Sequence, residues 1–186
     1  KLYFENSSYA MKINGIVKKL ETYYLRQSFT SKISDITKNA NVVFPRIIAF
    51  CKQNNIIQNG KPFIIYKTYD TIKDLTKASF CIPIKDQIFI SEGSDISSGK
   101  LVAFEALKTS LSGNYTYKNK ALFETTAYTT AKNIQTGSSF SHMEIFTKGR
   151  NENLSPSKWL TEIYFPIAPK VAPVPKKVYK KIINDS

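Results

Sequence analysis

The chain contains the same pattern twice, and this internal duplication constrains its fold more than any other feature. Residues 59–84 include PFIIY and FCIPI, and residues 139–167 include HMEIF and IYFPI. Aligning the two segments places Pro83 on Pro166 and Tyr66 on Phe146. The spacing between these anchors is 17 residues in the first copy and 20 in the second, a difference that one longer hairpin loop explains. Each segment is therefore predicted to form a β-hairpin.

A helix is predicted before each hairpin. The first is expected at residues 34–54, where Ala40, Phe44, Ile47 and Cys51 recur at spacings of three and four. Within it, Pro45 predicts a kink or a late helix start, because proline cannot donate a backbone hydrogen bond. The second helix is expected at residues 117–133. Its four threonines lower the intrinsic helix propensity, so it must depend on tertiary packing.

A strand is predicted ahead of each helix, at residues 20–29 and 99–111. The fold class is then α+β: two β-α-β-β units, forming an eight-stranded antiparallel sheet with two main helices on one face. The domain is expected at residues 15–168, with repeats at about 20–84 and 99–167. Residues 1–14 are interpreted as an N-terminal extension or the end of an upstream domain, and residues 169–186 as a basic tail rich in proline and lysine.

Composition excludes several classes of function. The net charge is +13, but the charge is scattered and matches no DNA- or RNA-binding motif, so no sequence-specific DNA binding is expected from this chain alone. The positive charge alone leaves open an interaction with nucleic acid or with an anionic surface. One histidine and two cysteines provide no metal site, and no cofactor is expected. No apolar run is long enough to span a membrane, and no signal peptide is present, so a cytoplasmic location is favoured.

Two carboxylates break the symmetry of the repeat. Glu162 aligns with Ser79, and Glu144 aligns with Ile64. Burying an unpaired carboxylate costs several kcal/mol or forces its protonation, so a partner must offset that cost. Two structural alternatives stay open: Glu144 could face solvent, because strands alternate, and Glu162 could form a salt bridge. The functional alternative is contact with a bound molecule.

Aromatic residues on the predicted strands would complete such a binding site. A carboxylate in a low-dielectric groove attracts a cationic ligand, and aromatic walls add cation–π attraction. For each aromatic residue taken singly, core packing is the competing interpretation. The candidate ligand-binding residues are Glu162, Glu144, Tyr24, Tyr66, Phe104, Phe146, Trp159 and Tyr164.

The ordered motifs LKTSLSGNYTYKNKALFET, HMEIFTKG and WLTEIYFPI resemble those of the GyrI-like small-molecule-binding family, the bacterial transcription activator effector-binding domains. This resemblance implies a pseudo-two-fold domain in which two helices flank a groove that binds amphipathic, aromatic or cationic molecules. It places the family's buried glutamate at Glu162. Phe146 stands where the family often has tyrosine. The resemblance extends to proteins that carry a START-like (SRPBCC) domain upstream, whose last helical turn would be KLYFEN.

Two functions follow as hypotheses. The leading one is a module that binds a small hydrophobic, cationic or amphipathic molecule. It is not a complete transcription factor, because only about 20 residues precede the first repeat strand, too few for a helix-turn-helix domain. The alternative is a hydrolase of small electrophilic xenobiotics, with Glu162 as general acid or base and Tyr66 or Tyr164 assisting. No catalytic residue is assigned otherwise, and the binding module is preferred over the enzyme.

Overall fold

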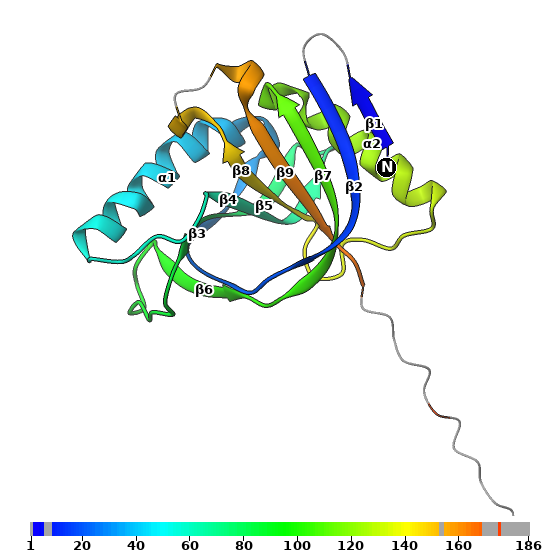
Figure 1. Cartoon of the computed structure of the whole chain (residues 1–186). Coiled ribbons are helices and arrows are strands. Elements are labelled where there is room, and N and C mark those ends of the chain that lie inside the picture. Colours follow the sequence, from blue (N-terminus) through cyan, green and yellow to red (C-terminus); the bar gives the residue numbers. More distant parts are fainter. Residues whose placement is uncertain (1, 6–8, 153–154, 169–174, 176–186) are drawn as a thin grey trace, which may run out of the picture.

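The structure is a computed structural model that describes residues 2–5, 9–152, 155–168 and 175. Its strands form one antiparallel sheet in the order β1-β2-β7-β9-β8-β4-β5-β3-β6 (Figure 1). The strands are β1 (Leu2–Glu5), β2 (Tyr9–Lys19), β3 (Thr22–Lys32), β4 (Phe63–Asp70), β5 (Leu75–Ile84), β6 (Ser97–Leu101), β7 (Phe104–Gly113), β8 (His142–Lys148) and β9 (Leu160–Pro166). The helices are α1 (Ile36–Gln53) and α2 (Lys118–Ala131), with short 3-10 turns η1 (Ile33–Asp35), η2 (Tyr115–Tyr117), η3 (Arg150–Glu152) and η4 (Pro156–Lys158).

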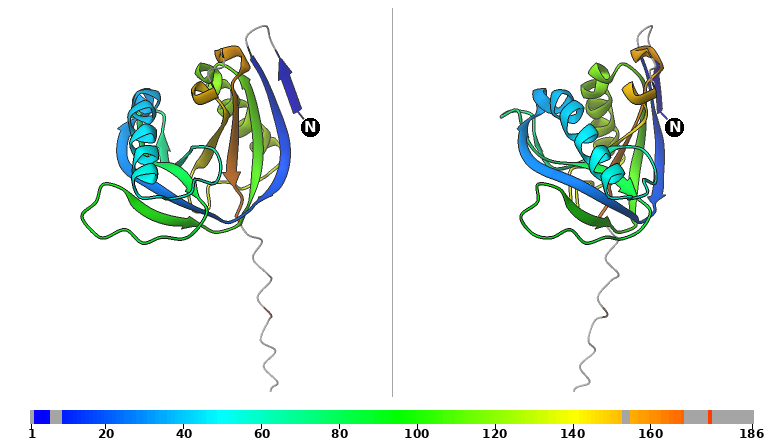
Figure 2. Two further views of the ribbon diagram at one scale, coloured as in Figure 1. Left: turned by 60° about the vertical axis from the view of Figure 1, so that its left-hand side comes forward. Right: turned by 90° about the vertical axis from the view of Figure 1, so that its left-hand side faces the viewer.

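The duplication is visible in the sheet. One copy is β3-α1-β4-β5 and the other is β7-α2-β8-β9, and their strands follow the same order outward from the β4–β8 boundary. At that boundary Ile64 lies directly opposite Glu144, so two residues that align in the sequence meet across the pseudo-two-fold axis. Figure 2 shows α1 and α2 on the same side of the curved sheet. The predicted α+β class, with its two main helices on one face, is confirmed.

The sheet extends further than the two repeats. Residues 1–14 were expected to be an extension or the end of an upstream domain, but residues 2–5 form the strand β1, and the strand β2 covers residues 9–19. The β2 strand pairs along β7, because its alternation buries Met11 and Ile13 against Leu107 and Leu111. This arrangement covers an edge that the second repeat would otherwise expose.

Two further expectations differ from the structure. The strand expected at residues 99–111 is divided into β6 and β7, because β6 pairs with β3 while β7 pairs with β2 and β9. Pro45 does not delay the first helix, which begins at Ile36 and continues past the proline. Pro45 is exposed on the outer surface of α1. The proposed basic tail lies outside the described residues, apart from Pro175.

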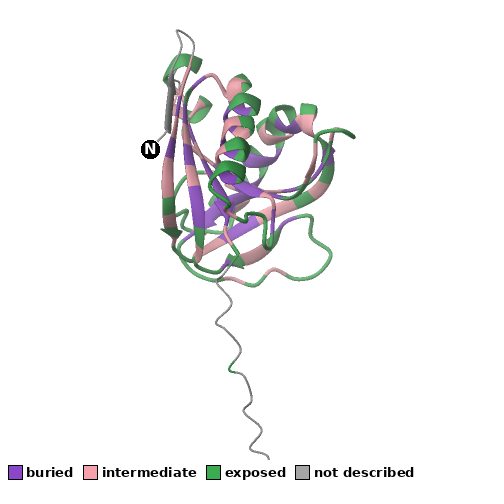
Figure 3. Cartoon of the chain, turned by 90° about the vertical axis from the view of Figure 1, so that its right-hand side faces the viewer, coloured by how far each residue is buried: buried purple, intermediate pink, exposed green. Residues whose placement is uncertain are grey.

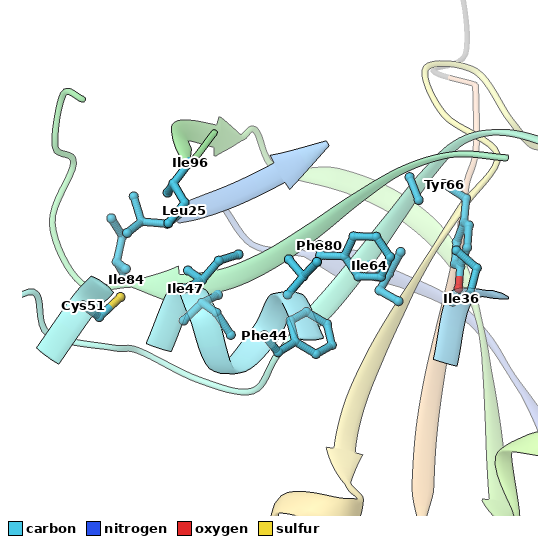
Figure 4. Close-up of a cluster of buried hydrophobic side chains, with 13 residues drawn as sticks. Leu25, Ile36, Phe44, Ile47, Cys51, Ile64, Tyr66, Phe80, Ile84 and Ile96 are labelled. Atoms are coloured by element: carbon cyan, nitrogen blue, oxygen red, sulfur yellow. The ribbon is translucent and has the colours of Figure 1, made fainter. Parts of the chain in front are cut away.

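Each helix covers its own apolar cluster. Under α1, Phe44, Ile47 and Cys51 pack on strands β3, β4 and β5, in a cluster that extends from Ile84 to Tyr66 (Figure 4). Under α2, Ala121 packs with residues of β2, β7 and β9. Buried residues therefore lie on the strands and on the inward helix faces, and exposed residues lie on the outer faces (Figure 3). No helix in the described part of the chain is long and apolar enough to cross a membrane.

Candidate functional site

A cavity of about 110 Å³ lies between α1 and the centre of the sheet. On the helix side, Ile36, Ala40 and Phe44 face it, because positions four residues apart share one face of a helix. On the sheet side, β4 contributes Ile64 and β8 contributes Phe146. The remaining lining residues are Thr37, Asn41, Pro62, Tyr115, Lys148, Gly149, Arg150, Asn151, Glu152, Trp159 and Thr161. The cavity lies beside α1, and none of its lining residues belongs to α2.

Aromatic side chains make up much of its wall. The Phe146 ring packs edge-on against Phe44 at 6.0 Å and against Tyr115 at 5.5 Å between ring centroids. Trp159, the single tryptophan of the chain, comes from the turn that leads into β9. Apolar and aromatic walls of this kind are typical of small-molecule sites.

A buried carboxylate lies directly behind Tyr115. The side chain of Glu144 on β8 is 0% exposed. Its Oε2 accepts hydrogen bonds from the Tyr115 hydroxyl and from the Tyr66 hydroxyl, the latter at 3.1 Å. Its Oε1 lies 3.4 Å from Lys118 Nζ and 3.5 Å from His142 Nε2. Tyr115 is the only one of these five residues that also lines the cavity, so it connects the cavity to the carboxylate.

The ammonium of Lys118 is enclosed by tyrosines. Its side chain is 7% exposed, and Nζ donates to the Tyr115 hydroxyl at 3.0 Å and to the Tyr66 hydroxyl at 3.4 Å. Nζ also lies over the rings of Tyr115, Tyr66 and Tyr69, at 4.8, 5.1 and 5.6 Å from their centroids. We call Tyr66, Tyr69 and Tyr115 the tyrosine cage. With Glu144 beside it, this cage gives the ammonium both a counter-ion and aromatic faces.

The surroundings of this cluster keep the Glu144 carboxyl ionised and the hydroxyls of Tyr66 and Tyr115 protonated. Burial of Glu144 opposes ionisation, but the Lys118 charge and the His142 and Tyr115 contacts outweigh it and lower the pKa of this carboxyl to about 2. Burial, and then the Glu144 charge, raise the pKa values of the Tyr66 and Tyr115 hydroxyls well above 10. Burial also lowers the pKa of His142 below its ordinary value of 6.5, so its ring is neutral at pH 7.

Charged residues surround the mouth of the cavity. Lys148 and Arg150 are exposed there, and neither forms an ion pair within the described part of the chain. Glu152 is already engaged, because Lys61 Nζ lies 2.7 Å from its Oε1 and the Gly149 amide donates to its Oε2 at 2.7 Å. The uncompensated charge at the mouth is therefore positive.

The structure separates the eight predicted site residues into two groups. Phe146 and Trp159 line the cavity, and Glu144 and Tyr66 lie immediately behind it. The other four, Tyr24, Phe104, Glu162 and Tyr164, project from the opposite face of the sheet, because they alternate with residues that face the helices.

Glu162 adopts the structural alternative that the sequence left open, a salt bridge. Its carboxylate accepts a hydrogen bond from the Tyr164 hydroxyl at 2.7 Å, lies 3.5 Å from Lys108 Nζ and is 20% exposed. Glu144, in contrast, does not face solvent. The carboxylate beside the cavity is therefore Glu144 rather than Glu162.

Sequence reasoning missed Lys118, His142 and the role of Tyr115. Lys118 is the first residue of α2, and the first residue of α1 is Ile36, which lines the cavity. The pair Lys118 and Glu144 in the second copy thus corresponds to Ile36 and Ile64 in the first. A search for oppositely charged residues in one copy at positions where the other copy has apolar residues would have found this pair. The Gly113-x-Tyr115 motif had already drawn attention to Tyr115.

No protein-family model matches the sequence, and no curated protein does. Several solved structures, however, are similar to the structure of this chain. The chain is similar to EcmrR in its DNA complex, with TM-score 0.72, 17% identity and coverage of 86% of this chain and 57% of that chain. The EcmrR C-terminal domain gives TM-score 0.69, 18% identity and coverage of 90% and 99%.

Two other structures are similar at lower scores. SAV2435 bound to tetraphenylphosphonium has TM-score 0.57, 14% identity and coverage of 82% of this chain and 92% of that chain. A hydrolase from Listeria innocua has TM-score 0.53, 10% identity and coverage of 84% and 93%. At these identities the similarity concerns the fold. The chain has the fold of the EcmrR C-terminal domain, which is consistent with the GyrI-like resemblance of its sequence motifs.

Proposed function

We propose that this domain binds a small, largely hydrophobic molecule in the cavity between α1 and strands β4, β8 and β9. The observation that carries the proposal is an apolar cavity with aromatic walls, placed against a buried cluster that contains the ion pair of Lys118 and Glu144. A packed core has no need of such a hollow, because protein interiors are filled nearly to the density of organic crystals. One similar structure, SAV2435, was solved bound to a small molecule, tetraphenylphosphonium, and this supports the proposal.

The dimensions of the cavity limit what it can hold. An apolar cavity of roughly 150 Å³ is large enough for a benzene ring. This cavity has a volume of about 110 Å³, and exposed residues such as Lys148 and Arg150 lie at its mouth. A ligand would therefore bury at most about one ring and extend the rest of its structure over the mouth.

Contact with the buried carboxylate would be indirect. A ligand in the cavity reaches the Tyr115 side chain, whose hydroxyl is bonded to Glu144. The buried glutamate expected from the family resemblance is thus assigned to Glu144, and it acts through Tyr115.

The hydrolase alternative receives less support. Glu162 lies on the sheet face away from the cavity, and Glu144 has a pKa of about 2, which makes it a weak general base near neutral pH. Tyr66 and Tyr115 hold their protons too firmly to be effective acids, because burial raises their pKa values. The similar Listeria innocua structure is a hydrolase, but the geometry here favours binding.

A regulatory role would need more than this chain. This chain covers 57% of the EcmrR chain in the DNA complex, so the EcmrR chain that binds DNA is longer than the part that this chain matches. An upstream SRPBCC-like domain stays a prediction from the sequence.

Trp159 provides a direct assay, because the single tryptophan lines the cavity. We expect tert-butylbenzene, a one-ring apolar probe, to change Trp159 fluorescence in a saturable way. Ala40→Phe should fill the cavity and weaken binding at least tenfold, about 1.4 kcal/mol. Ala49→Phe is the matched control, since Ala49 is exposed on the same helix and does not line the cavity. Equal loss in both variants, or saturable binding that survives Ala40→Phe, would contradict the assignment.

A further inference from the structure

The charge of the ligand can be inferred from the cluster behind Tyr115, given the proposed function of the cavity. We propose that the site takes small aromatic anions and discriminates against organic cations, because the ammonium of Lys118 already compensates the buried carboxylate of Glu144. Lys118 thus takes the place of a cationic ligand beside Glu144. The charges that remain for a ligand to neutralise are the positive charges of Lys148 and Arg150 at the mouth.

The first step concerns the position of Lys118. Aromatic faces and a carboxylate are the groups with which proteins hold cationic ligands. Here the Lys118 ammonium is bonded to two cage tyrosines, lies over three of their rings and is 3.4 Å from Glu144. A cationic ligand would gain nothing from Glu144 unless it displaced Lys118, and a displaced ammonium would lose its counter-ion inside a buried site.

The second step compares the two repeats. At the equivalent positions, the first copy has Ile36 and Ile64, which pack in the apolar cluster under α1 and line the cavity. The same fold position therefore tolerates an apolar pair. Since a buried ion pair is often no more stabilising than such a pair, stability alone does not explain Lys118 and Glu144. Their presence next to the cavity indicates a role in selecting what binds.

The third step concerns the mouth of the cavity. Lys148 and Arg150 line it and form no ion pair among the described residues, while Glu152 is neutralised by Lys61. With Lys118 and Glu144 compensating each other, the field that a ligand meets is positive. An apolar groove with such a rim attracts anions and repels cations. The ring of the ligand would lie on Phe44 and Phe146, with its anionic group toward the mouth.

Three one-ring probes test the charge preference in the intact chain. Benzenesulfonate is an anion, tert-butylbenzene is neutral, and phenyltrimethylammonium is a cation with the shape of tert-butylbenzene. Trp159 fluorescence at low ionic strength measures each Kd, and calorimetry confirms it. We expect the wild-type protein to bind benzenesulfonate at least tenfold more tightly than phenyltrimethylammonium. Tighter binding of the cation than of the anion would overturn the inference while leaving the binding function intact; no binding of any probe would overturn both.

Variants test the cause. Lys118→Met leaves Glu144 without its counter-ion, and a cation in the cavity could then compensate this charge across Tyr115. The affinity for phenyltrimethylammonium should therefore rise at least tenfold in Lys118→Met, whereas it should not rise in Lys118→Met/Glu144→Gln. Lys120→Met is the matched control, because Lys120 is exposed on the same helix and does not line the cavity. It should retain the wild-type order of affinities. A cation affinity that is unchanged in folded Lys118→Met, or raised equally in the double variant, would refute the role of Lys118. Should Lys118→Met not fold, the wild-type order of affinities still decides the preference.

Discussion

The buried pair of Lys118 and Glu144 yields the sharpest prediction about stability. We consider Lys118→Ile and Glu144→Ile, singly and together, because isoleucine occupies both equivalent positions in the first repeat, at Ile36 and Ile64. Removing one partner of a buried ion pair leaves an uncompensated charge and typically costs about 3–5 kcal/mol. The side chains here are 7% and 0% exposed, so solvent cannot take over the role of the lost partner.

The double variant should behave differently. Replacing a whole buried ion pair with apolar residues is often neutral or stabilising, by about 1–4 kcal/mol. Against that, the Tyr66 and Tyr115 hydroxyls lose their carboxylate acceptor, and an unsatisfied buried hydroxyl costs about 1–3 kcal/mol. The two hydroxyls lie 3.2 Å apart and can still bond to each other. We therefore expect the double variant to lie within about 2 kcal/mol of the wild type.

Urea unfolding followed by circular dichroism measures all four proteins. The double-mutant cycle should give a coupling free energy of at least about 4 kcal/mol, since each single change costs more than the two changes together. Lys100→Met removes an exposed pair with Glu21 and should leave the unfolding free energy nearly unchanged, which makes it the control. Additive single effects, or a Lys118→Ile variant as stable as the wild type, would refute the claim that the pair is buried and mutually dependent.

Three further predictions follow from the described contacts. The Glu144 pKa falls from 4.5 to about 2 on folding, so its contribution is present above pH 4.5 and is lost as the pH falls toward 2; Glu144→Gln should remove about 2 kcal/mol of the stability difference between pH 5 and pH 2.5 in urea titrations. Phe80→Ala should cost about 3–5 kcal/mol in urea unfolding, because Phe80 is fully buried and packs on Phe29 and Phe44; a loss below 1 kcal/mol would contradict that packing. Gly99→Ala should cost about 1–3 kcal/mol, since its Cβ would lie 2.7 Å from the Tyr24 ring, and Ser98→Ala on the same strand is its control in a thermal melt.

The duplicated architecture could be predicted from sequence, because it depends on local periodicity. The helical spacing of Phe44, Ile47 and Cys51 located α1, and the aligned anchors at Pro83 and Pro166 located both hairpins. The strands β1 and β2 were not recognised as part of the sheet. The pairing of β2 with β7 joins segments almost a hundred residues apart, and no local pattern reports such a partner.

The sequence by itself determined that carboxylates break the symmetry of the repeat, and it named Glu144 among them. Only the tertiary structure decided which carboxylate lies beside the cavity. Both strand faces around Glu162 are apolar, and alternation states which residues share a face without stating which face the helices cover. The structure turns Glu144 toward the helices and Glu162 away from them. It also brings Lys118 to Glu144 from 26 positions earlier in the chain, and this ion pair depends on where the first residue of α2 lies relative to β8, which no pattern along one strand or helix encodes.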